Sequence, residues 1–106
     1  MEFYKDLYWG ASLKKKKEKV LYRLEEGTVQ LHLYLLVLPV QERNQLEFFD
    51  SLLLKQTWFA DAAALKVAGI ANGYEEAVEL VQQMTEDTLR ETGTANIRRY
   101  LEQSWK

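Results

Sequence analysis

The stretch that decides the fold is Thr28 to Leu38, which reads T-V-Q-L-H-L-Y-L-L-V-L and is followed by Pro39. Its residues alternate at the period of a β-strand. One face is aliphatic and consists of Val29, Leu31, Leu33, Leu35 and Val37, whereas the other begins polar and becomes apolar at Leu36 and Leu38. Apolar residues on both faces predict a central strand that is covered from both sides, as in α/β proteins. The stretch is too short to cross a bilayer as a helix.

Apolar residues at helical spacing predict four helices around this strand. They run from Ser12 to Gly27, from Asn44 to about Trp58, from Asn72 to Gly93, and from Thr94 into a short C-terminal helix and tail that ends at residue 106. The starts carry side chains that cap helices, including Asn44 with Glu47 three residues later. Leu65–Ala71 is predicted as a second strand. Residues 2–9 alternate as a short strand or an aromatic arm would, and the sequence does not decide between the two.

The predicted order of elements is α-β-α-β-α-α in a small single α/β domain over residues 1–106. The connection between the two strands, residues 39–64, is long enough for a crossover helix, so it predicts a right-handed parallel β-α-β core. Helices would pack on a sheet of two or three strands. A third strand would come from residues 2–9 or from a second copy.

Composition excludes several classes of site. The chain has no cysteine, one histidine and a net charge of −2. A disulfide framework and a thiolate nucleophile are therefore excluded, and His32 alone does not build a metal site or a catalytic triad. The sequence gives no candidate catalytic residue, metal ligand set or cofactor motif. The first residues carry two acids and no apolar run, which predicts a cytoplasmic protein without a signal peptide.

The charges are unevenly distributed, and the most unusual feature is the run from Lys14 to Lys17. Cations in the first turn of a helix oppose its dipole, so an anion bound there would relieve them. In the predicted topology three helix N-termini meet at one edge of the sheet. The candidate anion or phosphate site at this edge consists of Ser12, Lys14, Lys15, Lys16, Lys17, Arg43, Asn44, Asn72, Gly73 and Tyr74.

Other interpretations of these residues stay open. Lysines on a helix are usually solvated, and four glutamates could pair with them: Glu42, Glu47, Glu75 and Glu76. Gly69-x-x-x-Gly73 lacks the Gly-Lys-Ser/Thr of a phosphate-binding loop and is interpreted as a turn. Nucleic acid binding through the lysines and nearby aromatic residues is disfavoured by the net charge and by the acidic third helix.

More apolar side chains are present than a small sheet can cover, which predicts an interface in a homodimer. The candidate interface residues are Leu36, Leu38, Phe48, Leu54 and Phe59.

The segments Val67–Ala77, Lys5–Tyr8 and Ser12–Lys17 resemble a group of small uncharacterised cytoplasmic proteins of mostly Gram-positive bacteria. The resemblance implies a bacterial, cytoplasmic origin and carries over no activity or cofactor. The residues themselves favour a non-enzymatic interaction or regulatory module that self-associates. The alternative is a protein that binds a small anion or phosphate ligand at the lysine run.

Overall fold

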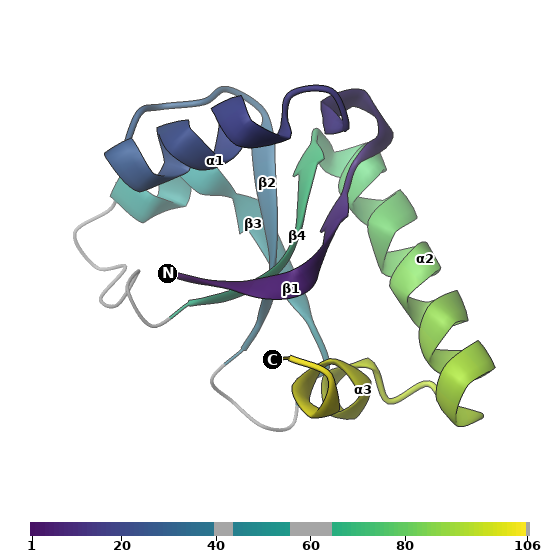
Figure 1. Ribbon diagram of the computed structural model, residues 1–106. Coiled ribbons are helices and arrows are strands. Elements are labelled where there is room, and N and C mark those ends of the chain that lie inside the picture. The colour runs from purple at the N-terminus through teal and green to yellow at the C-terminus, as the bar shows by residue number, and fades with distance from the viewer. Residues whose placement is uncertain (40–43, 56–64, 106) are drawn as a thin grey trace.

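The computed structural model describes residues 1–39, 44–55 and 65–105, which form a four-stranded sheet with helices on both faces (Figure 1). In chain order the elements are β1 (Glu2–Trp9), the 3₁₀ helix η1 (Ala11–Leu13), α1 (Lys17–Glu26), β2 (Leu33–Leu38), β3 (Glu47–Asp50), the 3₁₀ helix η2 (Ser51–Lys55), β4 (Lys66–Asn72), α2 (Tyr74–Thr92) and α3 (Ile97–Gln103).

The strands lie in the order β1-β4-β2-β3. β4 is parallel to β1, with Glu2 opposite Lys66, and antiparallel to β2, with Leu33 opposite Asn72. β3 is antiparallel to β2. The sheet is therefore mixed, and β4 and β2 are its two central strands.

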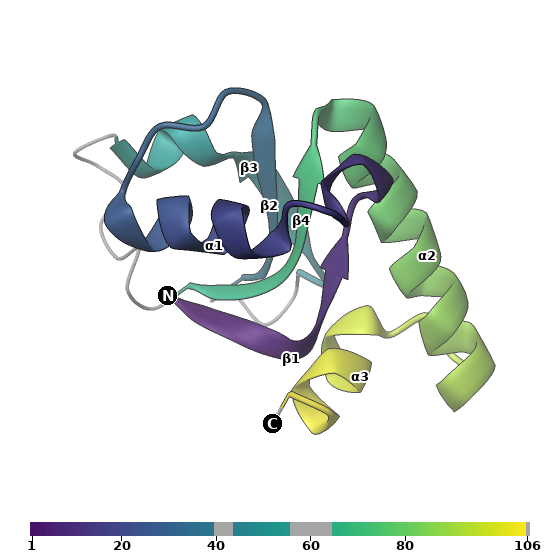
Figure 2. The same ribbon diagram turned by 45° about the horizontal axis from the view of Figure 1, so that its top comes forward.

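The helices form a layer on each face of the sheet, with α1 on one side and α2 and α3 on the other (Figures 1 and 2). β2 alternates between the two layers as expected from its sequence. Leu35 and Val37 pack with Val20 of α1, and Leu36 and Leu38 pack under α2 and α3. The α/β class and the central position of this strand are thus confirmed.

Residues 2–9 form a strand, and Trp105, near the C-terminal end of the described residues, packs against it. The indole ring of Trp105 lies 5.3 Å from the ring of Tyr4, and its Nε1 donates to Glu2 Oε1 at 2.7 Å. Lys66 Nζ lies 5.8 Å from the same ring. Trp105 is buried, so the segment after α3 completes the core over β1 and β4.

The predicted parallel β-α-β core and the predicted order α-β-α-β-α-α are wrong. Residues 47–50 form a strand and 51–55 a 3₁₀ helix where a helix over 44–58 was expected, and 56–58 lie outside the described residues. Phe48 and Phe49 point to opposite faces of the sheet, the period of a strand. The chain therefore turns back beside β2, and β4 joins the other side of β2 in the antiparallel direction. The sheet has four strands instead of two or three.

The central strand is also shorter than predicted, because residues 28–32 do not join it. Gln30 turns its side chain to donate to the carbonyl of Val20, and His32 has a left-handed backbone with φ 64°. Val29 and Leu31 are exposed. The alternation of Val29 and Leu31 with polar neighbours thus did not mark a buried face.

The remaining helices lie close to their predicted positions. α2 ends at Gly93, whose φ of 76° is the left-handed conformation that glycine adopts at the end of a helix. α3 is capped by Asn96, whose Oδ1 accepts from the Arg99 amide, instead of by Thr94. α1 starts at Lys17, after η1, so Ser12 does not cap it.

Candidate functional site

The predicted lysines gather at one end of the sheet. We call Lys14, Lys15, Lys16, Lys17 and Lys19 the lysine surface, and all five are exposed. They line an open hollow of about 450 Å³ at the junction of η1 and α1. No carboxylate among the described residues lies within 4.0 Å of their ammonium groups. Lys17 Nζ lies 5.9 Å from the ring of Trp9.

Ser12 and Asn72 lie close together at this end of the sheet. Both bind the Glu76 carboxylate of the protein instead of an external anion. Glu76 Oε1 accepts from the Asn72 amide at 2.8 Å and from Ser12 Oγ at 3.1 Å. Glu76 Oε2 accepts from the Ser12 amide at 3.3 Å. Because Glu76 occupies these donors, Ser12 has none left in place for an external anion. The sequence suggested Glu75 and Glu76 as partners of the lysines, but it did not reveal that Glu76 binds Ser12 and the Asn72 amide.

The other predicted ligand residues do not all converge. Asn44 precedes β3, at the opposite end of the sheet, where its Nδ2 donates to Glu47 Oε1 at 3.0 Å. This separation follows from the antiparallel pairing of β3 with β2. Arg43 lies outside the described residues. Gly73 and Tyr74 begin α2 and lie beside the contact between Ser12 and Glu76.

Tyr74 belongs to a group of three aromatic rings on the α2 side of the sheet. Its ring centroid lies 5.5 Å from that of Phe48 and 6.4 Å from that of Tyr34, and the rings of Tyr34 and Phe48 are 6.3 Å apart. We call these three residues the aromatic surface. Tyr74 is 61% exposed, whereas Tyr34 and Phe48 are half-buried. A large aromatic ring therefore faces solvent above strands β2 and β3.

The other predicted interface residues lie elsewhere. Leu36 and Leu38 are buried in the core beneath α2 and α3. Leu54 is half-buried and packs on the opposite face of the sheet, with the α1 layer. Phe59 lies outside the described residues. Of the four candidates that the structure describes, Phe48 alone lies in the aromatic surface.

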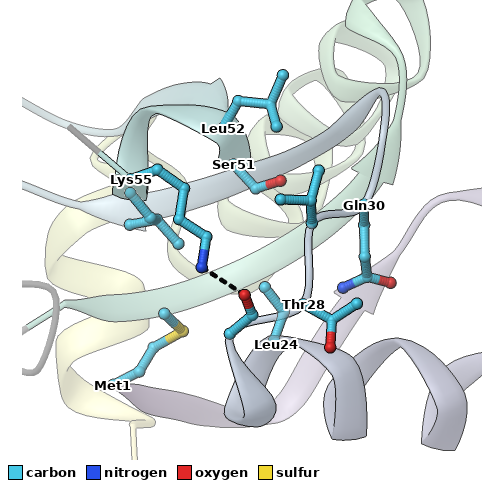
Figure 3. Close-up of a pocket in the computed structure, with 10 residues that line it drawn as sticks. Met1, Leu24, Thr28, Gln30, Ser51, Leu52 and Lys55 are labelled. Carbon is cyan, nitrogen blue, oxygen red and sulfur yellow. Dashed lines mark hydrogen bonds between the residues drawn. The ribbon is translucent and has the colours of Figure 1, made fainter.

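A second feature that sequence reasoning missed is a cavity of about 200 Å³ between the end of α1, the loop that follows it, and η2 (Figure 3). Apolar side chains of Leu24, Val29, Leu52 and Leu54 form much of its wall. Lys55 reaches across from η2 and donates to the Gly27 carbonyl, at the end of α1. Its described lining comes from Met1, from residues 24–30 and from residues 51–55, so no local sequence pattern signals it.

Ser51 supplies a hydroxyl to the same cavity. The residue is only 8% exposed, and its side chain has no hydrogen-bond partner among the described residues. Among the described residues, every side-chain nitrogen or oxygen atom that is fully buried has a hydrogen-bond partner. The Ser51 hydroxyl must therefore reach accessible space, and the space that it lines is this cavity.

Tyr8 and Asp87 form a short side-chain hydrogen bond on the α2 side of the sheet, in which the Tyr8 phenol keeps its proton. Tyr8 Oη donates to Asp87 Oδ2 at 2.6 Å, and Asp87 also pairs with Arg90 at 3.1 Å. Burial, and next the Asp87 carboxylate, raise the pKa of Tyr8 far above its ordinary value. This phenol is therefore a stable hydrogen-bond donor, which points to a structural role.

Known proteins supply no analogy for these sites: comparisons of the chain with family models, curated proteins and solved structures find no significant match. In residues 1–39, 44–55 and 65–105, no cluster of His, Asp or Glu side chains is arranged to hold a metal ion. None of the helices in those ranges is both long and apolar enough to cross a membrane.

Proposed function

We propose that the chain is a non-enzymatic interaction module that pairs with a second copy of itself through the aromatic surface. The observation that carries this proposal is the exposure of Tyr74, packed against the half-buried rings of Phe48 and Tyr34. Exposed tyrosine and phenylalanine are enriched in protein interfaces, and such rings often dominate the binding energy. A partner that covers Tyr74 would gain contact area on a ring that is already held in place.

Charge complementarity favours a second copy as that partner. Glu75, Glu79 and Glu86 are exposed and lie along the outer side of α2, since their spacing places them within about 40° of one another around the helix. We call them the acidic stripe, and no described cation pairs with them. The first turn of α2, which carries both Tyr74 and Glu75, lies next to η1, because Ser12 is bonded to Glu76. A two-fold axis near Tyr74 can bring the lysines of each copy to the stripe of the other.

The experiment replaces the exposed ring and compares it with a matched ring elsewhere. Tyr74→Ala should weaken dimerisation at least about tenfold, because a central aromatic ring is a typical interface hot spot. Tyr22→Ala is the control, since Tyr22 is 64% exposed but lies on α1, away from the aromatic surface. Sedimentation equilibrium or light scattering at micromolar concentration gives the dissociation constants.

Two results would remove this proposal. One is a monomeric wild-type chain up to about 100 µM, a range that includes weak dimers. The other is an equal loss of dimer in both variants, because a specific interface must distinguish Tyr74 from Tyr22.

A second candidate function is binding of a small anion by the lysine surface. It is favoured because none of the five lysines forms an ion pair with a carboxylate of the described residues. Phosphate at millimolar levels should then raise the melting temperature more than chloride of equal ionic strength, because it binds only the folded chain. Replacing Lys15 and Lys16 by Gln should abolish this difference. Equal melting in the two salts would exclude the anion site and leave the interaction module.

A further inference from the structure

The cavity between α1 and η2 has the composition of a small-molecule site. We infer that it binds a short aliphatic monocarboxylate, with the carboxylate on Lys55 and Ser51 and the hydrocarbon tail against Leu24, Val29 and Leu54. This inference is independent of self-association, because the cavity lies on the face of the sheet opposite the aromatic surface.

The hydroxyl of Ser51 is the first indication of a ligand. In a residue that is only 8% exposed, the hydroxyl is normally paired within the protein. The Ser51 hydroxyl has no such partner within the part of the chain that the structure describes, and it opens into the cavity. It can donate one hydrogen bond to a bound molecule and can also accept.

Lys55 determines the charge of that molecule. Among the described residues that line the cavity, it is the one with a charged side chain. One of its three hydrogens goes to the Gly27 carbonyl and so satisfies the negative end of α1. Two hydrogens remain for a carboxylate, and hydrogen bonds between an ammonium and a carboxylate are among the strong ones. A cationic ligand would be repelled, whereas a carboxylate also satisfies Ser51.

The size and the walls of the cavity determine the rest of the molecule. A cavity of about 150 Å³ accommodates benzene, so this one, at about 200 Å³, takes a ligand of roughly seven or eight heavy atoms. Pentanoate has the required size, with a four-carbon tail for the leucine and valine side chains. A ligand this small should bind with a Kd on the order of 1 mM.

The test uses pentanoate as the probe, with the methyl groups as reporters of its position. In NMR titrations at constant ionic strength, pentanoate should shift the methyl signals of Leu24, Val29 and Leu54. Leu101, which is buried on the other face, should not respond. Acetate, which lacks the tail, and 1-pentanol, which lacks the charge, should each bind at least about tenfold more weakly.

Variants separate this site from the lysine surface. Lys55→Gln should raise the Kd for pentanoate about tenfold, and Ser51→Ala, which keeps the fold and the cavity wall, about threefold. Lys14→Gln is the matched control and should leave the Kd unchanged, because Lys14 lies at the other end of α1.

Several outcomes would overturn the inference. These are no shift of the three methyl groups at 20 mM pentanoate, equal binding of 1-pentanol, or a Kd that changes with Lys14→Gln but not with Ser51→Ala. The last result would place the anion on the lysine surface.

Discussion

At the scale of single residues, Glu76 joins two segments that are far apart in the sequence. Its carboxylate accepts from Ser12 in η1 and from the Asn72 amide at the end of β4. Gly10 makes room for it, because a Cβ atom at this position would lie 1.8 Å from Glu76 Oε1. The backbone of Gly10 has φ −58°, which any residue can adopt, so only the space requires glycine.

We predict that Glu76→Ala lowers the free energy of unfolding by about 1–2 kcal/mol, because it leaves three donors without their acceptor. Glu75→Ala, which also removes an acid from the first turn of α2 but breaks no described bond, should cost less than about 0.5 kcal/mol. Urea unfolding of both variants measures the difference. Equal costs would mean that the carboxylate stabilises only through the helix dipole.

Gly10 provides a second test of the same contact. Gly10→Ala should destabilise the wild-type chain by about 1 kcal/mol, because the new methyl group expels the Glu76 carboxylate from its donors. In the Glu76→Ala background the same change should cost almost nothing, which gives a coupling free energy of about 1 kcal/mol in a double-mutant cycle. Additive costs would contradict the assigned contact.

The raised pKa of Tyr8 predicts that the free energy of unfolding falls at alkaline pH. Its pKa is raised in the folded chain by burial and by Asp87, whereas in the unfolded chain it ionises near pH 10. Below pH 10 both states keep the proton, and the stabilisation is fully present. Above pH 10 only the unfolded chain releases it, so stability falls as pH rises. Tyr8→Phe should reduce this slope in urea unfolding between about pH 9 and 11. An unchanged slope would contradict the prediction.

At the scale of elements, the segment from Asn44 to Lys55 explains why sequence reasoning failed where it did. Asn44 and Glu47 are hydrogen-bonded, but through their two side chains and not as a capping box, because Glu47 begins β3 instead of lying in a helix. Spacing alone cannot separate the two structures in so short an apolar run, because Phe48 and Phe49 fit either one. The segment forms a strand because its backbone pairs with the free edge of β2.

The prediction succeeded where a pattern was long or was buried on both sides. α2, with its regular apolar face, and β4, with its uninterrupted buried residues, lie close to their predicted ranges. The candidate sites were less predictable. The contact of Tyr74 with Phe48 and the cavity at Ser51 both depend on the antiparallel hairpin of β2 and β3, which the sequence did not reveal.

The segment after α3 should contribute strongly to stability. Trp105→Ala should lower the free energy of unfolding by about 3 kcal/mol, because it removes a buried indole that packs on Tyr4 and is bonded to Glu2. Trp105→Phe keeps the ring and loses the hydrogen bond, so it should cost about 1 kcal/mol. Urea unfolding measures both. A loss below 1 kcal/mol for Trp105→Ala would mean that this segment does not seal the core.

At the scale of the whole molecule, the charges are separated although the net charge is small. The lysine surface and the acidic stripe lie on different elements, and the described ion pairs involve neither. If they meet across the proposed dimer, dimerisation should weaken when salt is raised from 50 to 500 mM, because salt screens charges near the surface.

Charge reversal tests this arrangement directly. Lys15→Glu with Lys16→Glu in one chain should weaken dimerisation about tenfold, as should Glu79→Lys with Glu86→Lys in another. An equimolar mixture should form a heterodimer of nearly wild-type affinity, because each reversed surface then faces its complement. Native mass spectrometry counts the species. If both variants dimerise as the wild type does, the charges do not contribute to the interface.

The parallel pairing of β1 with β4 has a consequence for synthesis on the ribosome. β1 is translated before β4, the strand that it pairs with, and before Trp105, which seals it. At ordinary translation rates the nascent chain therefore carries an aromatic strand without its partner for several seconds. We expect β1 to be cleaved by protease in chains arrested before residue 66 and to be protected after release. Protection in the arrested chain would mean that β1 finds a temporary partner.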